Sequence, residues 1–272
     1  METIDCRADR HAVTRLRDGT WMDAHDDLAE EVPVALEYNG ISHAVMLATP
    51  ADLEEFALGF SLSEGLIASP QECHDITTSR SSAGITVHLA IGNAAFAQLK
   101  ERRRNLAGRT GCGLCGTESL EHVLRSLPRL SRPAPPRPLS PSGIRRALAG
   151  LDALQPLNRM TGGTHAAAWC APDGELRFVF EDVGRHNALD KLIGAMARSR
   201  ADFADGFALI TSRASVEMVQ KAITVGMPAL VAISAPTSLA VRVAREHGMT
   251  LVAFARGDDF AAYAHRANIR AE

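Results

Sequence analysis

The sequence predicts an α/β protein with a mostly parallel, mixed sheet in its C-terminal part and a smaller α+β part before it. After residue 140, short apolar runs alternate with amphipathic stretches, which is typical of βαβ units. Before residue 130, short strand-like runs flank turn signals. Between the two parts, closely spaced prolines over residues 128–141 predict a stiff, extended connector. We therefore expect two domains, residues 1–130 and residues 140–272.

The N-terminal part begins with a segment that has no clear periodicity, so residues 1–25 are expected to form a frayed polar lead-in. Asn39-Gly40 tolerates positive φ at both turn positions and predicts a hairpin. Thr49-Pro50 predicts the start of a helix, because threonine can cap a helix and proline suits its first position. The elements expected here are strands over 32–38, 41–48, 73–78 and 85–91, and helices from 49, over 94–104 and over 118–127.

Residues 108–116 (GRTGCGLCG) contain four glycines and the pair Cys112 and Cys115 in a C-x-x-C spacing. Glycine at this density predicts a flexible loop. The spacing is compatible with half a zinc site, a dithiol redox couple or a persulfide carrier. No second C-x-x-C supplies further ligands, so we expect no structural metal, although His165 and Cys170 could fold back toward the pair. Arg109 offers positive charge that favours a thiolate.

The C-terminal part begins with a helix at Ser140-Pro141 and then alternates between strands and helices. The apolar run 229–233 fits a strand that is buried on both faces. The expected strands are 166–170, 176–181, 207–211, 229–234 and 250–254, and the expected helices are 187–198, 215–225 and 237–247.

Polar residues follow these strands, where open α/β sheets bind their ligands. Asn187, Ser215 and Thr237 are each explained as helix caps. Arginines and a histidine at successive strand ends are not explained in this way, and arginine forks onto phosphate. We therefore expect an anionic ligand beside the helix N-termini. The candidate binding residues are His165, Arg185, His186, Ser212, Arg213, Ser234, Thr237 and Arg256. A structural role for His165 remains an equal alternative.

Composition excludes several classes of function. Lys plus Arg is 29 and Asp plus Glu is 32, so the net charge of −3 disfavours a nucleic-acid partner. Apolar runs fall short of the ~18 residues that a membrane-spanning helix needs. The first residues show no apolar signal region, and an odd cysteine count with one close pair indicates reactive thiols in the cytoplasm.

Several long motifs closely resemble the formate dehydrogenase accessory sulfurtransferase family, FdhD. They are GRTGCGLCG at 108–116, TGGTHAA at 161–167, EDVGRHNALDK at 181–191, SRAS at 212–215 and SAPT at 234–237. The resemblance extends from about Val32 to Tyr263. It implies a cytidine-deaminase-like fold for the C-terminal part.

The resemblance implies a sulfur carrier. Sulfur would come from a cysteine desulfurase as a persulfide on Cys112, with Cys115 as its partner. It would pass to the molybdenum of bis-molybdopterin guanine dinucleotide, as formate dehydrogenase requires, with GDP as a mimic of that cofactor. A homodimer is expected. The family's cofactor-binding segment falls on Phe254, Ala255, Arg256, Gly257, Asp258 and Asp259, although Asp258-Asp259 is poorly suited to phosphate where many relatives have a basic residue.

Two alternatives remain beside this interpretation. A zinc-dependent deaminase needs H-x-E followed downstream by P-C-x-x-C. Here His165 is followed by two alanines, and the C-x-x-C pair lies upstream of it without a preceding proline, so order and composition both fail. A chaperone that binds the molybdenum cofactor without moving sulfur fits the strand-end arginines equally well. Only Cys112 and its glycine-rich surroundings favour transfer.

Overall fold

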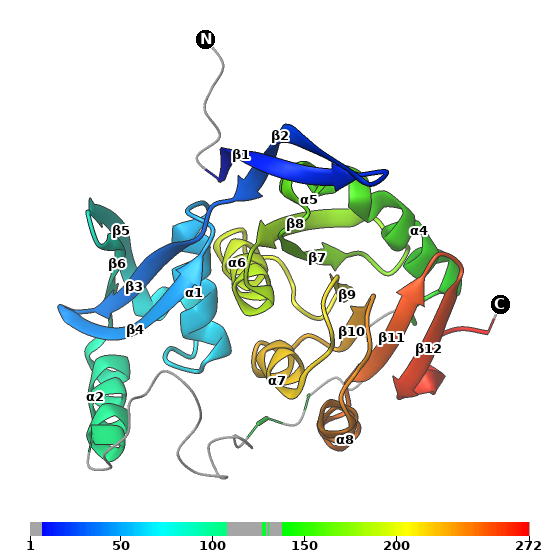
Figure 1. The fold of residues 1–272 in the computed structure, drawn as a ribbon. Coiled ribbons are helices and arrows are strands. Elements are labelled where there is room, and N and C mark those ends of the chain that lie inside the picture. The colour runs from blue at the N-terminus through cyan, green and yellow to red at the C-terminus, as the bar shows by residue number, and fades with distance from the viewer. Residues whose placement is uncertain (1–6, 108–126, 129, 131–137, 272) are drawn as a thin grey trace.

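The structure, a computed structural model, describes residues 7–107, 127–128, 130 and 138–271, with the backbone alone for residues 102–107 (Figure 1). It contains a two-stranded sheet, a four-stranded sheet in the order β4-β3-β6-β5, and a six-stranded sheet in the order β12-β11-β10-β9-β7-β8. The predicted loop 108–116, the helix 118–127 except Leu127, and most of the proline-rich connector lie outside the described residues.

The N-terminal segment is a hairpin of β1 (Ala8–Arg17) and β2 (Thr20–Ala29), so the expected frayed lead-in is wrong from Ala8 onward. Asp18 and Gly19 form the turn, and both have positive φ. Asp-Gly is favoured in two-residue hairpin loops because it adopts this conformation at low cost. The Asp18-Gly19 turn signal is present in the sequence. Many residues beside it are charged, so the alternation of apolar and polar residues in the two strands was not recognised.

The four-stranded sheet agrees with the prediction. Its strands are β3 (Val32–Tyr38), β4 (Ile41–Ala48), β5 (Cys73–Ser81) and β6 (Gly84–Ile91), and α2 (Asn93–Ala107) follows them. Asn39 and Gly40 form the β3–β4 turn with positive φ, as predicted. A short 3-10 turn (Pro70–Glu72) precedes β5.

Helix α1 (Leu53–Ser63) begins after Asp52 and not at Thr49-Pro50, so that predicted start is wrong. Thr49 is held by residues that are distant in sequence. Its N–H donates to the Asp182 carboxylate at 3.1 Å, and its Oγ1 accepts from the Val183 N–H at 3.2 Å. These hydrogen bonds use the threonine groups that would otherwise cap a helix.

The six-stranded sheet contains every strand predicted after residue 140, together with β12, which the sequence analysis did not predict. Its strands are β7 (His165–Cys170), β8 (Leu176–Asp182), β9 (Phe207–Ile210), β10 (Ala229–Ala232), β11 (Thr250–Arg256) and β12 (Asp259–Ala264). The helices are α4 (Pro141–Leu151), α5 (Pro156–Thr161), α6 (Arg185–Arg198), α7 (Val216–Thr224) and α8 (Ser238–His247), with 3-10 turns at Asp152–Leu154 and Arg266–Asn268. Helix α4 begins at Ser140-Pro141, as predicted, and Ser140 caps it by accepting from the Gly143 N–H.

This sheet is mixed, but it is not mostly parallel as predicted. Only β9–β10 and β10–β11 are parallel, whereas β7–β8, β7–β9 and β11–β12 are antiparallel. The short connection between Cys170 and Leu176 explains part of the difference, because a parallel crossover needs a dozen or more residues. The tight turn at Gly257-Asp258 adds an antiparallel edge strand in the same way.

Helices cover both faces of the six-stranded sheet. One hydrophobic cluster contains Leu192 of α6, Met218 of α7 and Val243 of α8 against one face, and a second contains Ile144 and Leu151 of α4 against the other. The first cluster continues through α1 into the four-stranded sheet, so α1 lies between that sheet and α6 (Figure 1).

Helices α1 and α6 pack closely because each contributes a glycine at the contact. A Cβ on Gly59 would lie 1.7 Å from the Asp190 carbonyl oxygen, and a Cβ on Gly194 would lie 1.9 Å from the Glu55 carbonyl oxygen. Any larger residue would force the helices apart. The position of α6, which begins at Arg185, is therefore fixed by the N-terminal half of the chain.

Candidate functional site

One edge of the six-stranded sheet gathers every described residue that the sequence predicts for binding. The parallel strands β9, β10 and β11 bring their carboxyl ends to this edge. The antiparallel pairs add the amino end of β7 and the carboxyl end of β8. These strand ends follow the order β11-β10-β9-β7-β8 and span about 19 Å at roughly 4.8 Å per step. The edge is long enough for an extended ligand.

His165 begins β7 near the middle of this edge. The neighbouring Ala166 N–H donates to Thr211 Oγ1 at 2.9 Å, and the Thr211 N–H donates to the Ala166 carbonyl at 3.1 Å. The start of β7 is therefore fixed against the end of β9. Burial and the positive charge of Arg185 lower the pKa of His165, so the imidazole is neutral near physiological pH.

Arg185 and His186 open helix α6 directly after the β8 strand. Arg185 Nε and His186 Nε2 are buried and have no hydrogen-bond partner among the described residues. Buried polar atoms are normally paired, so both atoms are available to a ligand. Burial, then the charges of Arg185 and Lys221, lower the pKa of His186 to about 4, while Glu217 and Glu64 act in the opposite direction.

Other residues of the 181–191 segment are structural. The Asp182 carboxylate accepts hydrogen bonds from Lys191 Nζ at 2.7 Å, the Gly184 N–H at 2.8 Å and Asn187 Nδ2 at 2.9 Å. The side chains of Asp182 and Lys191 are both fully buried. Asn187 also donates to the Leu47 carbonyl at 2.8 Å, so it does not cap α6 as the simpler explanation proposed. This network holds the start of α6 and thereby positions Arg185.

A second buried ion pair lies deeper along α6. Lys221 Nζ of α7 contacts the Asp190 carboxylate at 2.8 Å and the Glu64 carboxylate at 2.9 Å, and Ser63 Oγ donates to Asp190 at 2.6 Å. The sequence analysis missed Glu64 and Lys221, because no local sequence pattern identifies residues that pair with partners so far away along the chain.

The loops after β9 and β10 lie side by side. The Ala214 N–H donates to the Ala235 carbonyl at 3.1 Å, and the Thr237 N–H donates to the Ala214 carbonyl at 3.0 Å. Thr237 caps α8 through its Oγ1, as its structural explanation predicts, whereas Ser215 makes no side-chain cap on α7. Ser212 is buried and Arg213 is exposed.

The segment 254–259 forms the end of this edge. Phe254 has positive φ and is 46% exposed, and its N–H donates to the Ser234 carbonyl at 3.2 Å. Ala255 is buried, so its side chain is not available to a ligand. Arg256 Nε donates to the Ile233 carbonyl at 3.2 Å. Gly257, Asp258 and Asp259 belong to the β11–β12 turn, where Arg145 Nε donates to the Asp258 carbonyl at 3.2 Å.

A cavity of about 440 Å³ adjoins this segment, and its lining includes Thr237, Arg242, Phe254 and Tyr263. It combines an exposed aromatic ring with arginine side chains, which suits a planar, negatively charged ligand.

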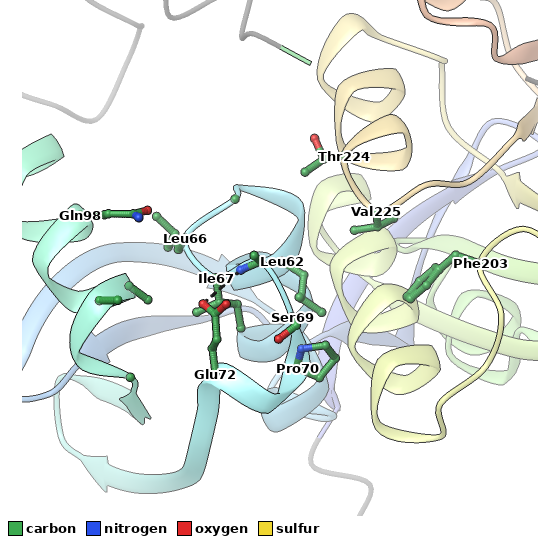
Figure 2. A pocket seen from close by; sticks show the side chains of 15 residues that line it. Leu62, Leu66, Ile67, Ser69, Pro70, Glu72, Gln98, Phe203, Thr224 and Val225 are labelled. Carbon is green, nitrogen blue, oxygen red and sulfur yellow. Dashed lines mark hydrogen bonds between the residues drawn. The ribbon is translucent and has the colours of Figure 1, made fainter. Parts of the chain in front are cut away.

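A larger cavity of about 700 Å³ contains none of the predicted site residues (Figure 2). Leu66 and Gln98 lie on one side of it, and Phe203 and Val225 lie on the other (Figure 2). Its lining is mostly apolar, with Glu72 among the few polar groups. It lies between the N-terminal part of the chain and the part that forms the six-stranded sheet, away from the strand-end edge.

Cys112 and Cys115 lie outside the described residues, so the structure does not relate them to the edge. Two other cysteines are described. Cys170 is fully buried, and burial raises the pKa of its thiol. Burial also raises the pKa of the Cys73 thiol, with the Asp75 carboxylate as a smaller cause in the same direction. Neither of these residues offers an exposed thiolate.

Within the described part of the chain, no three His, Cys, Asp or Glu side chains come together as a metal site would require. None of its helices has both the length and the apolar character needed to cross a membrane.

The lowered pKa of His186 predicts a pH dependence of stability. Between about pH 4 and about pH 6.5 the unfolded chain binds a proton at this imidazole that the folded chain does not, so the free energy of unfolding rises with pH across that window. His186→Gln removes this contribution and is expected to reduce the stability difference between about pH 5 and about pH 7.5 in urea titrations. His25→Gln, on the exposed hairpin, is the control and should keep the wild-type difference. An unchanged difference in His186→Gln would contradict the burial of a neutral imidazole.

Comparison with known proteins identifies the chain's relatives. A sequence model of the FdhD/NarQ family matches residues 29–270. The chain is 55% identical over 245 residues to the sulfur carrier protein FdhD of Variovorax paradoxus, covering 90% of this chain and 87% of the relative. It is 54% identical over 264 residues to the protein of that name from Cupriavidus necator, covering 96% and 90%. A crystal structure from Desulfotalea psychrophila, described as a formate dehydrogenase accessory protein, has a TM-score of 0.75 at 23% identity, covering 97% of this chain and 99% of that one.

Proposed function

The chain belongs to the FdhD/NarQ family, and from that premise we propose that it carries sulfur for formate dehydrogenase as a persulfide on Cys112. The relatives that match it over most of their length are named sulfur carriers, which supports the transfer of sulfur. The proposed donor is a cysteine desulfurase, and the proposed acceptor is the molybdenum of bis-molybdopterin guanine dinucleotide, which is a substrate here.

The choice of Cys112 rests on a comparison with the two described cysteines, Cys73 and Cys170. Cys170 is enclosed in the core, and burial holds the Cys73 thiol in its protonated form. Cys112 has glycine on both sides and Arg109 three positions before it. Nearby positive charge favours a reactive thiolate. The observation that carries the proposal is this contrast between two inert described thiols and a pair in a glycine-rich sequence.

The first transfer needs no external oxidant. The Cys112 thiolate attacks the outer sulfur of the donor's persulfide, a new sulfur–sulfur bond forms, and the donor cysteine leaves as a thiolate. Delivery of sulfide to the metal needs two electrons, because the outer sulfur of a persulfide is at oxidation state zero. Attack of Cys115 on the Cys112 sulfur supplies both electrons, forms a disulfide between the two cysteines and releases hydrosulfide.

We assign the cofactor to the strand-end edge. Arg185 and His186 hold buried, unpartnered nitrogen atoms there, and Arg213 is exposed two strands away. The remaining members of the proposed site are His165, Ser212, Ser234, Thr237, Phe254, Arg256 and the turn Gly257-Asp258-Asp259. The length of the edge, about 19 Å, suits a dinucleotide that extends across several strand ends.

The proposal includes features that follow from the family resemblance. They are a cytidine-deaminase-like fold of residues 140–272 and a homodimer. The proposal also includes the division into domains 1–130 and 140–272, which rests on the proline-rich connector between them. It also includes the cytoplasm as the compartment, because a reducing environment keeps the Cys112 and Cys115 thiols from being trapped as a disulfide.

The decisive experiment for transfer is mass spectrometry after incubation with a cysteine desulfurase and cysteine. One added sulfur on the peptide that contains Cys112 is expected, and it should disappear on reduction. A chain that binds the cofactor but never gains sulfur would support the chaperone alternative.

Binding of GDP tests the cofactor edge separately. Arg185→Ala and Arg213→Ala are each expected to weaken GDP binding by about 1.5–3 kcal/mol in calorimetry, because each removes a charged hydrogen-bond donor. Arg177→Ala is the matched control. It lies at the amino end of β8, where it pairs with Glu175 and Asp205 at the opposite edge of the sheet. If all three variants bind GDP as tightly as the wild type does, Arg185 and Arg213 do not belong to the binding site.

A further inference from the structure

Three polar side chains on the four-stranded sheet form a continuous hydrogen-bonded relay. Ser79 Oγ lies 2.8 Å from His88 Nε2, and His88 Nδ1 lies 2.9 Å from Glu37 Oε1. The residues belong to β5, β6 and β3, which are neighbours in that order. His88 stands between the buried Val87 and Leu89, so it points to the face of the sheet opposite the core. None of the three belongs to the strand-end edge or to the cysteine-bearing segment.

The chemistry of the groups fixes the direction of the relay. An ionised carboxylate only accepts hydrogen bonds, so His88 Nδ1 carries the hydrogen that it shares with Glu37. In the neutral imidazole with this tautomer, His88 Nε2 is an acceptor, and the hydroxyl of Ser79 donates to it. A serine whose proton is held by a histidine that a carboxylate orients is the arrangement of an activated nucleophile.

The relay is open to solvent, and a row of aligned side chains leads from Ser79 to the exposed Val45. The His88 side chain is 39% exposed. Strand pairing aligns Ser79 with Thr86, Ala35 and Val45 in one row across the sheet. Val45 is 50% exposed, about 14 Å from Ser79 at three strand spacings. An apolar chain attached at Ser79 can therefore lie along this row and cover Val45.

We propose that Ser79, His88 and Glu37 form a second, serine-based site that hydrolyses small esters with a medium-length apolar acyl chain. Ser79 Oγ attacks the ester carbonyl carbon while its proton moves to His88 Nε2. The ester carbon–oxygen bond then breaks, and the alcohol leaves with that proton. Water attacks the acyl-serine with the same help from His88, which releases the carboxylic acid and restores Ser79.

Hydrolysis of p-nitrophenyl octanoate by the full chain tests this site. Ser79→Ala and His88→Gln are each expected to lose about 100-fold or more of the rate, the usual contribution of general-base catalysis. Glu37→Gln is expected to lose less, because the histidine stays in place but is oriented less well. Ser81→Ala, on the same strand and face, is the control and should keep the rate. Mass spectrometry of the quenched reaction should find the octanoyl group on Ser79.

The apolar row gives an independent readout. Val45→Asn is expected to slow octanoate hydrolysis several-fold while leaving p-nitrophenyl acetate hydrolysis unchanged, because acetate is too short to reach β4. All of these positions are at the surface, so circular dichroism should show an intact fold in every variant. Equal octanoate rates in wild type and Ser79→Ala, or acylation only at other residues, would overturn the proposal.

Discussion

Replacing Cys112 with serine is expected to reduce the activation of formate dehydrogenase to the level seen without this chain. The hydroxyl of serine cannot form a persulfide, and the described cysteines do not replace the lost thiolate, because burial raises the pKa of both. The measurement is complementation of a strain that lacks the protein, with formate dehydrogenase activity as the readout.

Two further variants make this experiment specific. Cys73→Ser is the matched control, since it removes a half-buried thiol and should leave activation intact. Cys115→Ser is expected to be as severe as Cys112→Ser, because Cys115 releases the sulfur from Cys112. A milder loss would show that Cys115 only assists the Cys112 thiolate. Full activation by Cys112→Ser would exclude the persulfide mechanism and favour a cofactor chaperone.

Replacement of Lys191 with methionine is expected to destabilise the protein by about 3–5 kcal/mol, because it leaves the Asp182 carboxylate buried without a counter-charge. Lys191 and Asp182 are both fully buried and their charged atoms lie 2.7 Å apart. Lys191 Nζ also donates to the Thr49 carbonyl at 3.3 Å, so the change loosens the contact between the two halves of the chain as well. Urea unfolding measures the loss directly.

Arg198→Met on the same helix is the matched control. Arg198 pairs with Glu54 and Glu55, but its side chain is 46% exposed, so its loss is expected to cost about 0–1 kcal/mol. Comparing the free energies of unfolding of the two variants distinguishes the effect of a buried ion pair from that of an exposed one. Similar losses in the two variants would show that Asp182 does not depend on Lys191.

The sequence was sufficient for elements whose signals are local. Asn39-Gly40 predicted its hairpin, and the alternation of apolar runs with amphipathic stretches predicted β7 to β11 and the helices α4, α6, α7 and α8. Helix α5 and strand β12 were not predicted. The residues that follow β9, β10 and β11 were also correctly brought together, because the carboxyl ends of parallel strands share an edge. His165 and Arg185 reach the same edge through antiparallel pairing, which was not predicted. The direction of β7 was not predictable from its own apolar residues, since a buried run reads alike in either orientation.

The hydrogen bonds that position the site residues could not be predicted from the local sequence. Thr49 carries a local helix-start signal, but Asp182, 133 positions later, takes its N–H. Asn187 similarly looks like a cap, yet it donates to Leu47, 140 positions earlier. Such pairs are decided by tertiary packing, which overrides local propensity.

The close contact of α1 with α6 has a consequence for how the chain is made. Synthesis adds about 5–20 residues per second, so roughly 7–27 s pass between the emergence of Thr49 and that of Asp182. During that interval one side of α1, including the groove at Gly59, has no partner, although nearly every residue of the helix is buried in the finished molecule. The newborn N-terminal half therefore exposes apolar surface on the ribosome during this interval, and exposed apolar surface of this kind is prone to aggregation.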